Sequence, residues 1–130
     1  PRLVADTRLE YVDSRSSGIS RGVMVYQDIG FRPGRLPFRL DVRLALFDTD
    51  DYESRIYAYE DDLLYVFSVP PYYSRGYRTY LNMKYSAGRT DVWLKLARTG
   101  YANKQTIGSG LNEIRGSNKT TLYMQMRLRF

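Results

Sequence analysis

The sequence predicts an all-β fold, an antiparallel meander of about eight strands, and three observations point to it. Apolar and polar residues alternate with a period of two over several long segments, as side chains do on the two faces of a strand. Clusters of Gly, Pro, Asp and Ser separate these segments at the short intervals typical of hairpin turns. No segment combines a helical apolar stripe with an N-cap and a C-terminal Gly. Residues 1–130 are therefore expected to form a single β domain.

Eight segments between the turns have the alternation or the composition of strands. In chain order they are 2–13, 21–31, 36–48, 53–60, 63–69, 76–86, 90–101 and 119–130. The first three and the last three are long, and most of their alternate positions are aliphatic or aromatic. The fourth and fifth are shorter, rich in the strand-forming residues Tyr, Val and Ile, and lie between acidic residues and Pro70-Pro71. The polar segment 102–118 is expected to be a loop.

The last segment alternates most strictly. One of its faces carries only apolar side chains: Leu122, Met124, Met126, Leu128 and Phe130. The other face carries Tyr123, Gln125, Arg127 and Arg129. A helix would mix these two sets, so this segment is expected to be a strand.

Alternation alone does not tell which face of the sheet meets solvent. A soluble barrel turns its apolar face inward and a membrane barrel turns it toward lipid, and both give the same pattern. The strands of 11 or 12 residues favour the membrane form, since roughly 9 to 11 residues cross a bilayer. Many of the 13 tyrosines lie near strand ends, where a membrane barrel has its aromatic girdles. Tyr is also simply a good strand residue. A soluble antiparallel barrel or sandwich that binds carbohydrate or nucleic acid therefore remains the alternative.

Composition argues against catalysis. The chain has no His and no Cys, which removes the usual general base, the thiol nucleophile and the common zinc and haem ligands. Lys and Arg number 20 against 14 Asp and Glu, but the net charge of +6 is scattered rather than gathered in a tail. We expect no enzymatic activity, no metal and no cofactor. The longest apolar run, residues 63–67, is too short for a membrane-spanning helix.

Two acidic groups are expected to have structural roles. Asp48, Asp50, Asp51 and Glu53 could ligate Ca²⁺, but Asp is also a common turn residue and no Gly stands where an EF-hand loop needs one. The second group alternates with arginines, which indicates cross-strand ion pairs rather than a glycosidase pair. It consists of Asp6, Glu10 and Asp41, with Arg8, Arg39 and Arg43 between them.

Basic and aromatic residues share the polar faces of the last three expected strands. They are Arg78, Tyr80, Lys84, Trp93, Lys95, Tyr123, Arg127 and Arg129. Such a set could bind single-stranded nucleic acid by phosphate contacts and stacking. In a membrane barrel the same residues would face the lumen, paired with acids of neighbouring strands or lining a path for anions. Lumen packing is the expected role, and nucleic-acid binding is not expected.

Two resemblances support the membrane form. The strand that ends at Phe130 resembles the C-terminal signal strand of Gram-negative outer-membrane β-barrels. The segments 45–50, 54–60, 64–70 and 106–114 resemble the C-terminal region of a Bacteroidetes outer-membrane β-barrel family whose longer chains carry N-terminal helix-hairpin-helix elements.

The resemblances imply a non-catalytic barrel, or the C-terminal hairpins of a larger one, in the bacterial outer membrane. Its role would be structural, in assembly, or in solute passage. The implied partners are the lipid bilayer, the barrel-assembly machinery, and other envelope proteins or the rest of a longer parent chain. No helix-hairpin-helix residue lies in this sequence, so DNA binding does not carry over to it.

Overall fold

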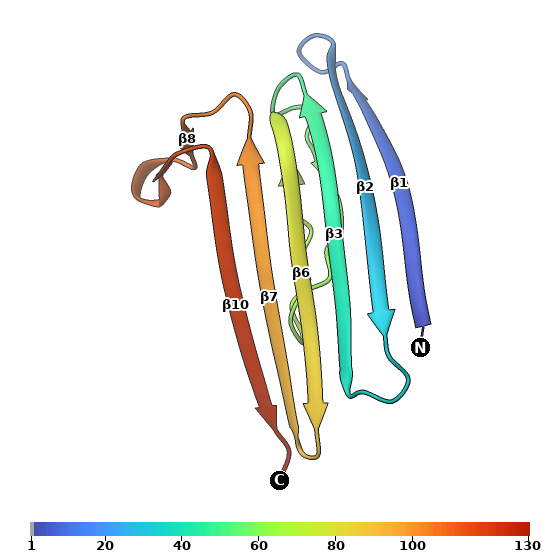
Figure 1. The fold of residues 1–130 in the computed structure, drawn as a ribbon. Coiled ribbons are helices and arrows are strands. Elements are labelled where there is room, and N and C mark those ends of the chain that lie inside the picture. The colour runs from blue at the N-terminus through green and yellow to red at the C-terminus, as the bar shows by residue number, and fades with distance from the viewer. Residues whose placement is uncertain (1) are drawn as a thin grey trace.

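The computed structural model describes residues 2–130, which form one large antiparallel sheet (Figure 1). Its six long strands are β1 (Arg2–Ser14), β2 (Ser20–Arg32), β3 (Phe38–Thr49), β6 (Arg75–Ala87), β7 (Thr90–Tyr101) and β10 (Asn118–Leu128). They lie in the order in which they occur in the sequence, and each pairs with the next. The all-β, antiparallel prediction is confirmed, and the six long strands begin and end within two residues of their predicted bounds.

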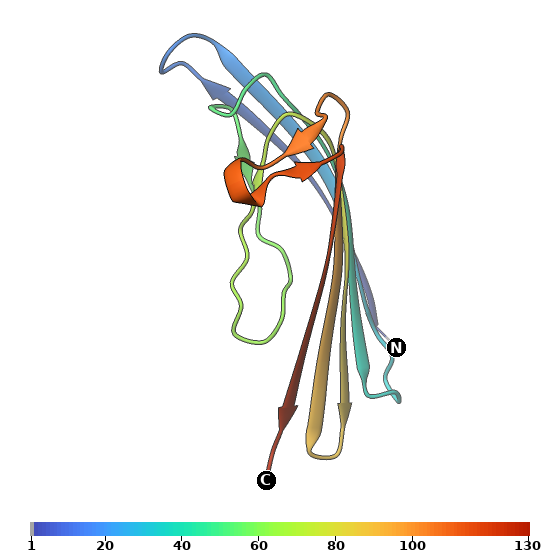
Figure 2. The ribbon, with the colours of Figure 1, turned by 90° about the vertical axis from the view of Figure 1, so that its left-hand side faces the viewer.

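The two predicted strands at 53–60 and 63–69 are wrong. Residues 50–74, which we call the strap, leave the sheet after β3 and fold over one of its faces (Figure 2). The strap contains only the short pair β4 (Ile56–Tyr57) and β5 (Pro71–Tyr72) and one bridge between Glu60 and Ser68. Its composition suits a strand, but Tyr65 has a left-handed φ of 64°, which breaks an extended run. The strap is held by its side chains instead.

The segment between β7 and β10 also differs from the expected plain loop. It forms a second small hairpin, β8 (Thr106–Ile107) and β9 (Ile114–Arg115), around the 3₁₀ turn η1 (Gly110–Asn112). This hairpin projects to the same side of the sheet as the strap (Figure 2).

The two faces of the sheet are buried in the opposite sense to those of a soluble protein. On β3 the charged Arg43 is 3% exposed beneath the strap, whereas Leu44 and Leu46 on the other face are each 53% exposed. We call the strap side the polar face and the other side the apolar face. One small apolar cluster lies between the strap and the sheet: Met24, Tyr26, Ala45, Phe47, Ile56, Ala58 and Tyr72.

The connections differ at the two ends of the sheet. At the lower end in Figure 1 they are short, residues 33–37 and 88–89, and both chain ends lie there. At the upper end they are 15–19, the strap, and 102–117. Within residues 2–130, β1 and β10 each pair on one side only, so the sheet is open.

Candidate functional site

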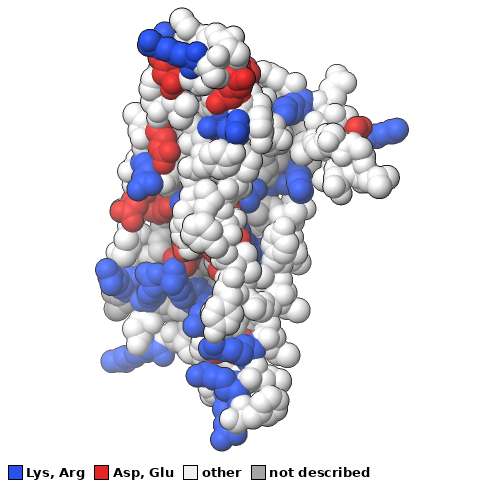
Figure 3. Space-filling model, turned by 180° about the vertical axis from the view of Figure 1, so that it is seen from behind, with Lys and Arg blue, Asp and Glu red and all other residues white. Residues whose placement is uncertain are grey.

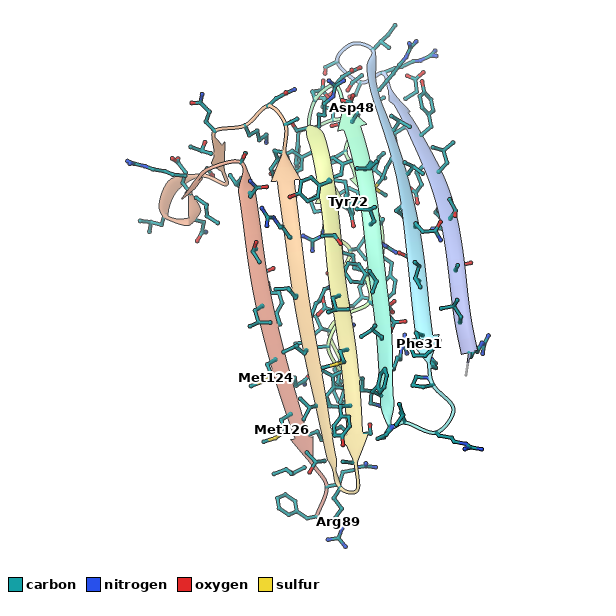
Figure 4. All side chains as sticks on the ribbon, in the orientation of Figure 1. Phe31, Asp48, Tyr72, Arg89, Met124 and Met126 are labelled. Carbon is teal, nitrogen blue, oxygen red and sulfur yellow. The ribbon has the colours of Figure 1, made fainter. Side chains whose placement is uncertain are left out.

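The apolar face is the most unusual surface of the described chain. Along the middle of the six strands its side chains are mostly Leu, Val, Ile and Met, and aromatic rings stand near the strand ends. Figure 4 shows Met124 and Met126 on β10, and Phe31 at the lower end of β2. Exposed members are Leu3, Leu9, Val23, Val25, Ile29, Leu44, Leu46, Leu96, Leu122, Met124, Met126 and Leu128. A contiguous exposed apolar surface of this kind marks a contact with lipid or with another protein.

Three polar side chains within this surface form hydrogen bonds inside the sheet, whereas Arg98 and Thr120, at its upper edge on β7 and β10, are exposed. Thr7 donates to Gln27 on the neighbouring strand, and the Gln27 amide donates to the Asp6 carbonyl at 3.0 Å. The Thr79 hydroxyl donates to the Arg43 carbonyl at 2.8 Å. Hydrogen bonds within the sheet are what polar groups need in an environment without water.

The apolar surface forms a band that runs diagonally across the strands. One row of paired residues crosses the whole sheet: Thr7, Gln27, Leu44, Thr79, Arg98 and Thr120. At its upper edge the last apolar residue is Tyr11 on β1, four residues above this row, and Leu122 on β10, two residues below it. The upper edge of the band therefore shifts by six residues over five strand-to-strand steps.

This shift defines an angle between the strands and the band. Six residues rise about 20 Å along a strand, and five strand spacings cover about 24 Å, so the strands tilt by about 40° from the normal of the band. Strands of membrane β-barrels tilt by about 35 to 45° from the bilayer normal. The band is therefore inclined as a bilayer would be across tilted strands.

The polar face is organised around one buried carboxylate of the strap. Glu60 has no exposed surface and accepts hydrogen bonds from Arg78 of β6, from Lys95 of β7 at 3.3 Å and from the Tyr72 hydroxyl at 2.5 Å. Burial raises the pKa of Glu60, but the bonds from Arg78 and Tyr72 outweigh burial and hold this pKa below its ordinary 4.5. Glu60 is therefore ionised at neutral pH and ties the strap to two strands.

Further contacts of residues 59–62 extend this anchor. Lys95 also donates to Asp62 at 2.7 Å, and Asn82 donates to the Asp62 carbonyl at 3.1 Å. Arg43 forms a bidentate pair with Asp28 and donates to the Tyr59 carbonyl, each bond at 2.6 Å. The strap thus supplies counter-charges for the basic residues of the polar face.

All eight basic and aromatic residues singled out from the sequence belong to the polar side of the sheet, but they form two groups. Arg78, Tyr80 and Lys95 meet the strap anchor, and the Asp61 amide donates to the Tyr80 hydroxyl at 3.2 Å. The other five lie toward β10 and the lower end: Lys84, Trp93, Tyr123, Arg127 and Arg129.

Trp93 is the centre of the second group. It is 5% exposed, the Lys84 ammonium lies 5.2 Å from its ring and the Arg127 guanidinium 5.5 Å. Its ring is therefore already occupied by cations rather than free for stacking on a ligand. Arg127 and Arg129 share Asp91 at 2.6 and 3.5 Å.

A cavity of about 350 Å³ lies between the strap and the lower half of the polar face. Arg39, Lys84 and Trp93 line it from the sheet, and Tyr59 and Asp61 from the strap. Burial and the neighbouring Asp41 raise the pKa of Asp61, whose nearest cation, Arg39, is 3.6 Å away. The lining mixes both charges, which gives no preference for one class of solute.

The strap was not predicted to be the partner of the polar face. Its cations were expected to pair with acids of neighbouring strands, yet Arg78 and Lys95 pair with Glu60 and Asp62 of the strap. One signal was present: the acidic triplet 60–62 is the densest run of negative charge outside the turn at 48–53.

The acidic residues at the end of β3 and in the turn after it each bind a separate set of partners. Asp51 accepts from Ser20 and from the Glu53 and Ser54 amides, Asp48 pairs with Arg75, and Glu53 accepts from two serines. The contacts of Asp51 lower its pKa, above all the bond from Ser20. Among residues 2–130 no three acidic side chains stand together as metal ligands.

The second acidic group forms the expected cross-strand ion pairs only in part: Arg32 of β2 lies 3.7 Å from Asp41 of β3, and among residues 2–130 Asp6 forms no ion pair. Two other pairs lie within strands. Arg39 pairs with Asp41 two residues away, and Arg8 lies 3.5 Å from Glu10. Arg43 instead pairs across strands with Asp28.

None of the helical segments in residues 2–130 has the length and apolarity needed to cross a membrane. No protein-family model, no curated protein and no solved structure matches the chain significantly.

Proposed function

We propose that this chain is part of the wall of a bacterial outer-membrane β-barrel, with the apolar face toward lipid and the polar face and strap toward the interior. The observation that carries this proposal is the diagonal apolar band. It favours a membrane because its inclination of about 40° matches barrel strands in a bilayer. The internally bonded Thr7, Gln27 and Thr79 favour the same environment.

The proposed barrel needs more strands than the six described. An unpaired backbone N–H or C=O costs several kcal/mol in hydrocarbon, and the outer edges of β1 and β10 would present a row of them. Outer-membrane barrels of a single chain have about eight strands or more. The closing strands would come from the rest of a longer parent chain or from another envelope protein, and assembly would involve the barrel-assembly machinery.

A structural role, without catalysis, fits the interior better than solute passage. The strap covers the polar face, and its carboxylates pair with Arg78 and Lys95, which would otherwise line a path for anions. The soluble binding module remains the rival. It would require a second layer over the whole apolar face, and its expected stacking residue, Trp93, is 5% exposed.

Two neighbouring substitutions on β10 test the orientation. Met126 lies at the middle of the apolar band on this strand, so M126R should destabilise the protein by about 2 to 4 kcal/mol in phosphatidylcholine vesicles. Gln125 faces the polar side, so the matched variant Q125R should have a much smaller effect. The measurement is urea unfolding in vesicles. Equal effects, or a water-soluble monomer without detergent, would reject the membrane proposal.

A further inference from the structure

The charged residues are distributed unequally between the two ends of the sheet. The lower connections, 33–37 and 88–89, contain one arginine each, the exposed Arg35 and Arg89, and no acidic residue. The upper connections contain both signs, for example Asp50, Asp51 and Glu53 beside Arg55. In Figure 3 the Lys and Arg atoms dominate the lower end, and most Asp and Glu atoms lie above it.

Both lower arginines lie directly below the apolar band. The turn of Arg35 follows Phe31 and precedes Phe38, whose rings are 6.2 Å apart at the lower edge of the band. Arg89 forms the tip of the turn between β6 and β7, at the lower extreme in Figure 4 and opposite Asp48 at the upper end.

Backbone contacts add a further cation beside Arg89. The Arg129 amide donates to the Arg89 carbonyl at 2.9 Å, and the Arg129 guanidinium donates to the Gly88 carbonyl at 3.2 Å. The nearest carboxylate, Asp91, is 3% exposed and is shared with Arg127. Exposed positive charge therefore accumulates at the edge of the band, where aromatic and aliphatic groups such as Phe130 and Leu36 are also exposed.

We propose that this lower rim binds the phosphate groups of anionic phospholipids, with Arg35 and Arg89 as the contacting residues. The inference rests on the proposed membrane function. If the band lies in hydrocarbon, both guanidinium groups reach the headgroup layer next to it, where an arginine gains attraction to anionic lipids. The upper end, with its mixed charges, gains no such attraction. The rim would thereby select the leaflet and lipid class that this end meets.

The test compares two double variants that lose the same charge. R35Q/R89Q changes the lower rim, and R15Q/R115Q changes two exposed arginines of the upper end. Apparent binding constants are measured for vesicles of phosphatidylcholine, with and without added phosphatidylglycerol. The unmodified chain should bind the anionic vesicles more tightly. R35Q/R89Q should lose up to about 25-fold of this preference, at about 5-fold per arginine, while R15Q/R115Q keeps it.

The outcomes separate the two proposals. An unchanged preference in R35Q/R89Q, or an equal loss in R15Q/R115Q, would overturn the rim proposal and leave the membrane function standing. Failure of the unmodified chain to enter vesicles of either composition would overturn both.

Discussion

At the scale of single residues, two adjacent carboxylates of the strap lie in environments that shift their pKa values in opposite directions. Glu60 is buried with Arg78, Lys95 and Tyr72 around it, and its pKa is lowered. Asp61 is also partly buried, but it lies near Asp41 and its pKa is raised. The ionised form of Glu60 therefore stabilises the strap, whereas the ionised form of Asp61 opposes it.

Acidification should release the strap. The pKa of Glu60 is lower in the folded protein than in the unfolded chain. Its contribution to stability is therefore fully present above pH 4.5, its ordinary pKa, and is lost as the pH falls through the lowered pKa. Replacing it by a neutral residue leaves buried cations without their partner, so E60Q should cost about 3 kcal/mol at neutral pH. Hydrogen exchange of the Glu60 and Asp61 amides, which bond Ser68 and Tyr80, reports this release.

The neighbouring variant D61N is the matched control. It removes a carboxylate whose ionised form is disfavoured, so the strap should stay protected or gain protection. Equal loss of protection in E60Q and D61N would show that Glu60 is not the anchor.

At the scale of elements, the strap needs a close approach to β2. Gly22 lies on the polar face, and a Cβ there would stand 2.4 Å from the Ser54 carbonyl oxygen, which is backbone and cannot turn away. Gly30 lies on the same face of the same strand, where a Cβ would meet the movable carboxylate of Asp41 at 3.1 Å. Only the first glycine is required by the strap.

G22A should therefore displace the start of the strap, at a cost of about 1 to 3 kcal/mol. G30A should cost clearly less. Urea unfolding in vesicles gives both free energies, and hydrogen exchange around Ser54 locates the change. A larger effect of G30A would mean that the strap does not rest on Gly22.

The sequence predicted the strands of the sheet and failed on the strap for one physical reason. Period-two alternation arises when the two faces of a strand lie in different surroundings, as at Leu122 to Leu128. Turn residues show where each alternating segment ends. The strap has no such faces, because it is held by individual contacts of residues such as Glu60. The basic residues of the polar face were found because they share the strand period. Their acidic partners were not, since pairing across a loop leaves no period in the sequence.

At the scale of the whole molecule, we propose that Phe130 has a role beyond packing. Phe130 is fully exposed at the lower end, beyond Leu128, the last paired residue of β10. Its removal should therefore change the free energy of unfolding of the described chain little. The proposal is that the barrel-assembly machinery would recognise this aromatic residue, on the ground of the resemblance of the last strand to the signal strand of outer-membrane barrels.

Deletion of Phe130 should therefore reduce insertion in cells far more than stability in vesicles. F130Y, which keeps an aromatic end, should insert normally. Membrane fractionation of bacteria that express the three forms measures insertion. Normal insertion of the truncated chain would contradict the resemblance.

The alternating direction of the six strands determines which parts of the chain lie at the same end of the sheet. Both chain ends lie at the end of the short turns, whereas 15–19, the start of the strap and 102–117 lie at the other. In a membrane, a label attached to either chain end would be reached from one side only, and an epitope inserted at 15–19 from the opposite side. Because the number of strands in the sheet is even, a label at either end of the described chain reports the same side of the membrane.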